Sequence, residues 1–490
     1  MVMRVGGIYS GMDIEAMVNK LMEAERMPLI RLKQQQTTLE WKRDAYREIN
    51  SKLLDLNNML LDMKLTRTYN PKSTTSSQES AVTASAASTA TNGSYEISVS
   101  QLATNEMQIS GILNFGLKDE LGIEGTFDFY TYNESGELET HKLDVSAEDT
   151  LETVLRNIGE ASNGRVRAFY VEDQDGGKVV LETTRTGVYN PNDSGKEIEY
   201  AADSFFTNIL KMDQGQYKEA TNATFTYNNG LVIETQENSY TLNGITFEFH
   251  NTTEGNARIS VNTDVDSSFE KIMDFVNKYN EVIEAMNKSQ TEQKYRDYLP
   301  LTDEQKEEMT DEQIKLWEEK AKSGILRGES SIRDGMYHLR SSLQSFVDIN
   351  GEFRLLSEIG ITTSKNYLSG GTLEVDEDKL KAALRDNPED VYQLFAGREE
   401  GDGRGLIYRF EEALDSVRGN IERQAGRSTQ TLDNYSLGKR MKEINERISD
   451  YERKLVRVEQ RYWAQFTQME KAIARLSEQS SYLFSQFGGM

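Results

Sequence analysis

Cysteine is missing from this chain of 490 residues. Its absence excludes disulfides, thiolate metal ligands and cysteine nucleophiles. No run of apolar residues approaches the roughly 18 residues of a membrane span. The first residues, Met1–Gly7, lack the apolar core and the cleavage site of a secretory signal peptide. We therefore expect no membrane insertion and no cleaved signal peptide.

Positive charge is also scarce. The chain has 56 Lys and Arg against 81 Asp and Glu, which gives a formal net charge of -25. A phosphate backbone is bound by clustered Lys and Arg, so we do not expect nucleic acid as a partner. Paired carboxylates suited to glycoside hydrolysis must occur by chance in such a chain, but no pair stands out. Most of these carboxylates are expected to lie on a solvated surface.

Motifs for catalysis and cofactor binding are missing as well. The glycines of the segment 401–405 follow a predicted helix and precede no Gly-Lys-Ser/Thr, which favours a hinge over a nucleotide loop. The segment after Asp173 lacks the bidentate glutamate of a calcium loop, which favours a turn. The histidines, His141, His250 and His338, are far apart in the sequence. We predict no enzyme, no cofactor and no metal site, although a triad assembled in space stays open.

The C-terminal region has the heptad pattern of a coiled coil. Apolar residues recur at alternating steps of three and four, at Met441, Ile444, Ile448, Tyr451, Leu455, Val458 and Tyr462. A second consecutive step of four leads from Tyr462 to Phe466, which is a stutter. The pattern then resumes at Met469, Ile473 and Leu476. These spacings predict one long amphipathic helix.

The N-terminal region supplies a matching helix. Leucine or tyrosine recurs every seven residues, at Leu32, Leu39, Tyr46, Leu53 and Leu60. The segment Ser10–Asp13 resembles a helix entry, and Ile14, Met17, Val18 and Leu21 follow on one face. Proline removes a helix donor and restricts the residue before it, so Pro28 predicts a break or kink, with the long helix restarting near Leu29. We expect the two terminal helices to pair with each other. If they pair antiparallel, the stutter near Tyr462 and the break at Pro28 would lie at comparable height.

In the middle of the chain, the spacing of the apolar residues first changes to a period of two. Alternating segments such as Tyr95–Val99 predict a β-rich insert from about 72 to 265, and the polar stretch 72–93 fits an extended segment or an edge strand. Asp175-Gly-Gly-Lys178 and Asn243-Gly244 are hairpin signals. A short helix is predicted over 151–158.

Helical patterns return after this insert. Ser267 and Glu270 are predicted to form a capping box. The repeated segments Thr302–Gln305 and Thr310–Gln313 each indicate a capped, acidic helix start. Further helices are predicted over 330–347, 377–385 and 391–395.

These patterns predict an α+β multidomain fold. Long terminal coiled-coil helices would form legs, a discontinuous helical bundle would follow, and β-rich head domains would be inserted into it. The predicted parts are a leg of 1–40 and 441–490, a bundle of 41–71 and 266–440, a β-rich domain of 72–105 and 221–265, and a variable β-rich insert with one short helix over 106–220.

Several ordered blocks resemble one known family. They include Ser10-Gly-Met-Asp-Ile14, Leu242-Asn-Gly-Ile-Thr-Phe247, Phe275-Val-Asn-Lys-Tyr-Asn280, Leu356-Ser-Glu-Ile-Gly-Ile-Thr362, Leu373-Glu-Val-Asp-Glu-Asp-Lys-Leu380 and Arg461-Tyr-Trp-Ala-Gln-Phe466. Together they are similar to the bacterial flagellar filament-capping proteins, the FliD or hook-associated protein 2 family. The similarity covers both ends and about two thirds of the chain, and the insert from about 106 to 220 carries little of it.

This resemblance implies a structural protein at the extracellular tip of the flagellar filament, exported by the flagellar type III apparatus. It implies a closed ring of copies, with five expected, that promotes insertion and folding of flagellin. A hook-filament junction protein and an export chaperone on the C-terminal helix are further implied partners. The expected leg and assembly interface comprises Ile14, Met17, Leu21, Leu32, Leu39, Tyr46, Leu455, Val458, Tyr462, Phe466, Met469, Ile473 and Leu476.

Two alternatives stay open. The chain could be a flagellin-like or junction subunit of the filament, which would polymerise helically where a cap would close into a ring. It could also be a tip adhesin, or a carbohydrate-active enzyme, acting through the insert 106–220. Glycan binding or glycan turnover by the insert would distinguish these alternatives.

Overall fold

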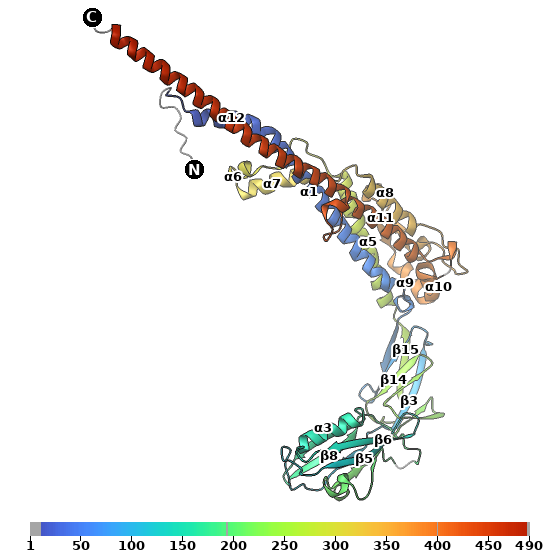
Figure 1. Cartoon of the computed structure of the whole chain (residues 1–490). Helices are drawn as coiled ribbons and strands as arrows, with labels where there is room; N and C mark the ends of the chain where they lie inside the picture. Colours follow the sequence, from blue (N-terminus) through green and yellow to red (C-terminus); the bar gives the residue numbers. More distant parts are fainter. Residues whose placement is uncertain (1–10, 193–194, 399, 488–490) are drawn as a thin grey trace. The chain divides into compact units, whose positions relative to one another are not determined.

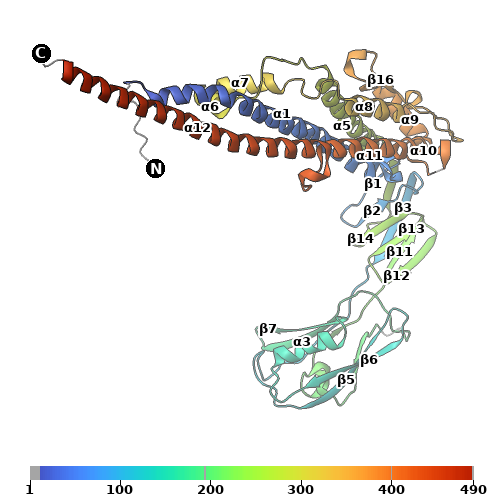
Figure 2. The same cartoon turned by 45° about the horizontal axis from the view of Figure 1, so that its top comes forward.

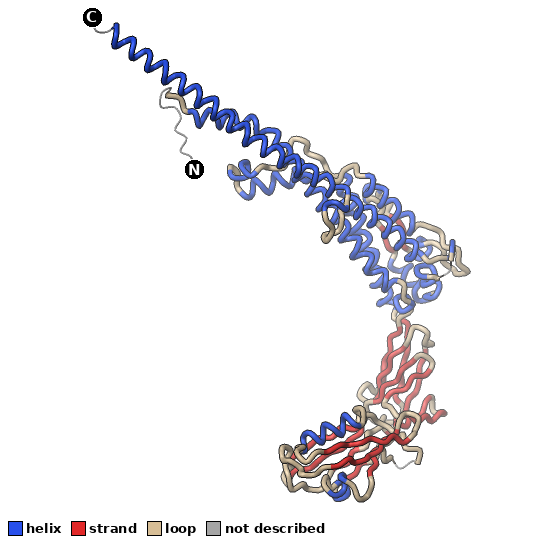
Figure 3. Tube along the Cα trace, in the orientation of Figure 1, coloured by secondary structure: helices blue, strands red, loops and turns tan. Residues whose placement is uncertain are grey.

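The computed structural model describes residues 11–192, 195–398 and 400–487 (Figure 1). The chain divides into two compact units, one formed by Met1–Tyr69 with Ser268–Met490 and one by Asn70–Ser267. The first, here called the helical unit, is built almost entirely of helices, whereas the second, the β unit, consists mainly of strands (Figure 3). This is the α+β fold with long terminal helices and inserted β domains that the sequence predicts.

The helical unit contains the two longest helices of the described chain, of 50 and 52 residues. Its helices are α1 (Ile14–Met63), α2 (Thr66–Tyr69), α5 (Val265–Thr291), α6 (Asp303–Glu307), α7 (Asp311–Lys322), α8 (Ser330–Leu343), α9 (Glu377–Asp386), α10 (Pro388–Ala396), α11 (Leu406–Ala425) and α12 (Ser436–Phe487). Two short strands, β16 (Ile361–Thr363) and β17 (Leu373–Val375), pair antiparallel beside them.

The bundle core lies between the C-terminal half of α1 and the helices α5, α8 and α11. Leu53, Leu56 and Leu60 of α1 are completely buried. The rings of Phe275 on α5 and Phe410 on α11 meet edge to face with centroids 5.7 Å apart. This core fixes one half of α1 and leaves its N-terminal half to pack against α12.

One part of the β unit is a sandwich of two sheets. A five-stranded sheet in the order β1-β15-β3-β11-β12 packs on a three-stranded sheet in the order β13-β14-β2. The strands are β1 (Lys72–Ser76), β2 (Val82–Ala86), β3 (Gly93–Gln101), β11 (Ala223–Tyr227), β12 (Leu231–Thr235), β13 (Ser239–Leu242), β14 (Ile245–Phe249) and β15 (Ala257–Thr263). Both strands from the polar stretch 72–93, β1 and β2, lie at sheet edges, as predicted.

The other part of the β unit has its own hydrophobic core. Its sheets run in the orders β10-β4-β8-β7 and β6-β5-β9, with α3 (Leu151–Ala161) and α4 (Phe205–Asn208) packed against them (Figure 2). The strands are β4 (Met107–Ile109), β5 (Gly125–Tyr132), β6 (Leu138–Val145), β7 (Val166–Glu172), β8 (Gly177–Thr183), β9 (Ile198–Tyr200) and β10 (Gln216–Lys218). The helix predicted over 151–158 is confirmed as α3.

Local turn and cap signals are well predicted. Asn243 and Gly244 join β13 to β14 with φ of 50° and 78°, the left-handed conformation that a type I′ hairpin requires. Thr302 and Thr310 cap α6 and α7, and each forms the reciprocal capping box with a glutamine three residues later. The segment after Asp173 is a hairpin turn, because the Asp173 carboxylate accepts from the backbone N–H of Asp175 at 2.9 Å.

Several predicted helix boundaries are wrong. Helix α8 ends at Leu343 and not at 347, and α10 begins at Pro388 and not at 391. Helix α1 runs unbroken through Pro28 and does not restart near Leu29. Pro28 and Ala24, whose carbonyl loses its usual N–H partner, are both exposed, so water can hydrate that carbonyl while Met22 and Leu29 pack on the partner helix.

Helix α5 begins at Val265, two residues before the predicted cap. The carboxylate of Asp264 accepts from the backbone N–H of Ser267 at 3.0 Å, so Asp264 is the cap and Ser267 already lies in the first turn. An acidic residue directly after a strand was the signal that the sequence interpretation missed.

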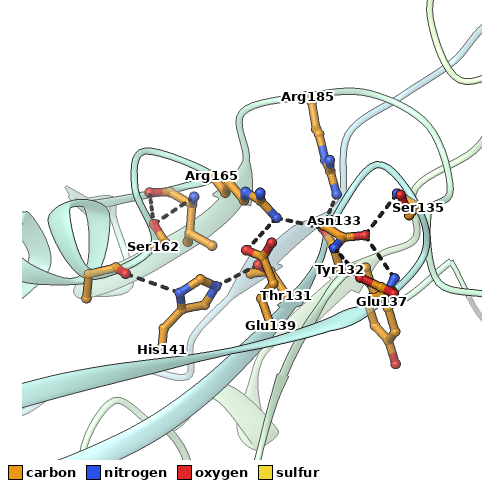
Figure 4. A network of polar contacts seen from close by, with 12 residues as sticks. Thr131, Tyr132, Asn133, Ser135, Glu137, Glu139, His141, Ser162, Arg165 and Arg185 are labelled. Atoms are coloured by element: carbon orange, nitrogen blue, oxygen red, sulfur yellow. Dashed lines mark hydrogen bonds and ion pairs between the residues drawn. The ribbon is translucent and has the colours of Figure 1, made fainter.

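His141 belongs to a polar network that holds β5 and β6 to the end of α3 (Figure 4). Its Nδ1 donates to the carbonyl of Ala161 at 3.1 Å, and its Nε2 lies 2.7 Å from the hydroxyl of Thr131. Burial lowers the pKa of His141 below its ordinary value. Beside it, Arg165 pairs with Glu139 at 2.7 Å. Both imidazole nitrogens are therefore committed to structural contacts.

Candidate assembly surface

The terminal helices α1 and α12 pair with each other, as predicted, and the structure shows that they are antiparallel. The hydroxyl of Tyr462 donates to the Glu25 carboxylate at 3.1 Å, and Lys33 lies 3.9 Å from Glu452. As the residue number falls along α1, its partner's number rises along α12. The stutter at Tyr462 therefore lies beside Glu25, one helical turn from Pro28.

A separate apolar cluster holds this helix pair together. Its buried members are Ile14, Val18, Met22, Leu455 and Val458. Met17, Leu29, Tyr451, Tyr462, Trp463 and Phe466 are partly buried against it. Together these residues form one stripe from each helix, which is the packing expected of a two-stranded coiled coil.

The predicted interface residues do not all belong to this cluster. Ile14, Met17, Leu455, Val458, Tyr462 and Phe466 meet in it. Leu32 is buried, and Leu39, Met469 and Ile473 are partly exposed. Leu21 and Leu476 are exposed, by 41% and 64%. Some of the predicted interface residues therefore pair α1 with α12, whereas the exposed ones can still contact a further partner.

Leu21 lies outside the buried cluster of the helix pair, and its place in the assembly interface stays a prediction. The buried stripe of α1 advances by steps of four through Ile14, Val18 and Met22, and Met22 is only 4% exposed. A straight helix completes a turn in 3.6 residues, so each step of four rotates the stripe by about 40°, and Ile14 and Met22 lie within about 80° of each other. The neighbouring apolar residues at 21 and 22 made the sequence pattern ambiguous here.

Tyr46 is a buried anchor of the helical unit. It is 1% exposed, and its hydroxyl donates to Glu329 at 2.8 Å, while Lys42 pairs with the same carboxylate at 2.5 Å. Burial raises the pKa of Tyr46. Burial opposes ionisation of Glu329, but its hydrogen bonds from Lys42 and Tyr46 leave the pKa of Glu329 lowered. Tyr46 thus fixes α1 to the bundle and cannot meet another copy.

The C-terminal end of α12 extends past the start of α1. The register set at Tyr462 brings Ile473 level with Ile14, where α1 begins. Beyond that point α12 exposes large apolar side chains, at Leu476, Tyr482, Leu483 and Phe484. Ile473, Leu476 and Phe484 also line a shallow groove with three serines of the same helix. We call residues 473–484 the apolar tip.

Contiguous exposed apolar side chains on a soluble protein mark a contact site. Leu476 is 64% exposed and Phe484 is 78% exposed, and both lie on the apolar tip. Among residues 11–192, 195–398 and 400–487, no group of three His, Cys, Asp or Glu is placed to hold a metal ion. No described helix has the length and apolar character needed to cross a membrane.

Comparison with known proteins identifies two matching family regions. Residues 10–106 match the flagellar hook-associated protein 2 N-terminus, and residues 220–478 match its C-terminus. The flagellar hook-associated protein 2 of Halalkalibacterium halodurans is 35% identical, with 98% of this chain and 99% of that protein covered. The one of Thermotoga maritima is 23% identical, over 99% and 96%.

A solved structure shares the fold. The D1-D2-D3 domains of the flagellar cap protein FliD from Escherichia coli superpose with a TM-score of 0.57 at 21% identity. The superposition covers 82% of this chain and 99% of that one.

Proposed function

The chain belongs to the flagellar hook-associated protein 2 family and has the flagellar filament cap role of that family, and we propose that it fills this role as a closed ring of identical copies. The family places the protein outside the cell at the filament tip. Family and role are those that the sequence blocks predicted.

We propose that the copies assemble through the legs, the paired helices α1 and α12, and this proposal rests on the apolar tip of α12. A lone helix pair buries one stripe per helix, whereas ordering each residue costs roughly 1–2 kcal/mol. Leu476 and Phe484 stay mostly exposed in the single chain. Contacts with other copies or with filament subunits would cover these side chains and offset the cost of ordering α12.

We also propose the number of copies in the ring and its partners in the filament. Five copies would close the ring, and flagellin would insert and fold beneath it. The filament below would begin at a hook-filament junction protein. The described chain supports a mechanical role, because its longest elements are packing helices and His141 is held by structural bonds. We infer that no catalytic step is involved.

Export is proposed to use the flagellar type III apparatus. An export chaperone would bind the C-terminal helix before assembly. The apolar tip has the character of a helix that docks in a groove, with Ile473, Leu476 and Phe484 on one face. The same face would later serve assembly, so chaperone binding would also prevent premature association.

The test is growth of filaments from short flagellin seeds with the purified full chain and flagellin monomers. We expect the chain to bind one end of each seed as a closed ring, seen by electron microscopy, and elongation to proceed at that end. Incorporation along the filament body would instead indicate a filament subunit. A chain that binds glycans but forms no ring would favour the alternative of an adhesin acting through residues 106–220.

A further inference from the structure

The helical unit carries an acidic surface that the cap role leaves unassigned. Residues 302–323, which include α6 and α7, contain eight Asp and Glu against four Lys. We call this segment the acidic arm. Within the described chain, Glu318 is the only one of these carboxylates in an ion pair, with Lys306 at 3.0 Å and Lys322 at 3.1 Å. Glu307 and Glu308 are exposed.

The acidic arm is fixed against the N-terminal half of α1. The side-chain amide of Gln34 donates to the carbonyl of Pro300 at 3.0 Å, just before α6. At the other end of the arm, Lys322 lies 4.7 Å from the ring centre of Trp41. Hydrogen bonds from its own backbone N–H and from Thr302 lower the pKa of Glu304, with smaller contributions from Lys33 and Arg26 of α1. Helix α6 therefore lies level with residues 26–34 of α1.

Helix α12 carries a row of arginines at the same level. Arg453, Arg457 and Arg461 follow one another in steps of four, so they share one face of the helix, and all are exposed. We call them the basic stripe. The contacts of Glu452 with Lys33 and of Tyr462 with Glu25 place this stripe beside residues 25–33 of α1.

The two surfaces lie on different sides of α1. Figure 2 shows α1 between α12 and the pair α6–α7, which agrees with the contacts of α1 with Pro300 on one side and with Glu452 on the other. The arm and the stripe of one chain are therefore level with each other but separated by α1. A neighbouring copy beside the legs could contact either surface.

We propose that the acidic arm of one copy docks on the basic stripe of the adjacent copy. This contact presupposes the ring of the proposed function. It would join neighbouring copies of the ring at their legs, the paired helices α1 and α12. Because the two surfaces differ and lie at one level, the contact is heterologous, and repeating it by rotation closes a ring without a step in height. Copies of a chain with net charge -25 repel one another, so local charge complementarity is needed to orient them.

The test is a charge swap in the full chain. Arg457→Glu with Arg461→Glu reverses the stripe, and Glu307→Lys with Glu308→Lys reverses the arm. Lys365→Glu with Arg385→Glu is the matched control, since these exposed residues of the helical unit lie outside the acidic arm, the basic stripe and the apolar tip. Circular dichroism checks folding, and the mass distribution against concentration gives the dissociation constant of the ring at physiological ionic strength.

We expect each reversal to raise that dissociation constant about tenfold or more, and the four substitutions combined in one chain to restore it to within about threefold. The control should stay within about threefold of the unchanged chain. Equal constants for all variants would overturn the proposal. So would stripe variants that form normal rings but fail to elongate filaments, because the stripe would then meet flagellin. An unchanged chain that forms no ring would refute the proposed function itself.

Discussion

Arg47 on α1 donates from Nε to the carbonyl oxygen of Ala425, the last residue of α11, at 3.1 Å. The same guanidinium reaches the carbonyls of Gly426 at 3.2 Å and Arg427 at 3.0 Å, and it lies 5.7 Å from the ring centre of Tyr435. One side chain thus closes the end of α11 and the turn that leads into α12. It connects α1 to the origin of its partner helix.

We expect Arg47→Ala to lower the free energy of unfolding by about 2–3 kcal/mol, because three carbonyls lose a charged donor. Arg47→Lys should recover only part of this, since an ammonium cannot reproduce the planar fork. Denaturant unfolding followed by circular dichroism measures both. Arg67→Ala is the control, because the Arg67 side chain is 74% exposed and its loss should cost less than about 0.5 kcal/mol. Equal effects of the two alanine variants would contradict the role given to Arg47.

Phe466→Asp and Ile473→Asp should each stop filament elongation while the bundle stays folded. Phe466 packs in the α1–α12 cluster and Ile473 lines the groove of the apolar tip, whereas the bundle core depends on residues such as Leu56. Elongation from seeds and thermal unfolding are the two measurements. Gln468→Asp adds the same charge at an exposed position and should elongate normally. Normal filaments from Phe466→Asp would contradict the leg assignment.

Backbone amides of residues 474–484 should exchange rapidly in the free chain and slowly in the ring. In the free chain no residue of α1 lies opposite this part of α12, so its helical hydrogen bonds open locally at little cost. Residues 441–458 should be protected in both states because Met441, Leu455 and Val458 are buried. Hydrogen exchange with mass spectrometry distinguishes the two segments. Full protection of 474–484 in the monomer would refute the idea that assembly orders the legs.

The stability of the β unit should depend on one buried carboxyl. Glu106 is fully buried and accepts from the backbone N–H of Ile198 at 2.7 Å. Burial raises its pKa from 4.5 to about 7 against the effect of its hydrogen bonds. The folded chain then holds this proton more tightly than the unfolded chain. The stabilising contribution is complete below about pH 4.5 and is lost as the pH rises towards 7.

The free energy of unfolding should therefore fall by roughly 3 kcal/mol across that range because of Glu106. Glu106→Gln should remove most of this dependence. Scanning calorimetry of the full chain between pH 5 and pH 8 measures the difference between the two proteins. Exposed Glu124→Gln is the control and should follow the unchanged chain. Parallel pH profiles for the unchanged chain and Glu106→Gln would contradict the burial argument.

Local signals explain why so much of the fold is readable from the sequence. Asn243-Gly244 and the two Thr-Asp-Glu-Gln segments act within a few residues, so their chemistry decides the turn or cap alone. The terminal heptads identify the long helices because one stripe per helix is buried. The finer division into four parts, with the insert 106–220, stays a prediction.

What the sequence interpretation missed depends on contacts between distant segments. Pro28 stays within α1 because packing on α12 outweighs one lost hydrogen bond. Met22 and Trp463 join the helix pair through its register, which one helix alone does not reveal. The burial of Glu106 and the position of the acidic arm beside Gln34 likewise follow only from the folded chain.

The mass of the purified full chain in solution, measured beside a truncated chain lacking 1–40 and 460–490, tests the ring most directly. The cap account predicts one closed assembly of a few copies for the full chain. It also predicts a monomer or a weaker assembly after truncation, because α12 loses the apolar tip and much of its pairing with α1. An open-ended series of polymers would point to a filament subunit, and a monomer in both cases would contradict assembly through the legs.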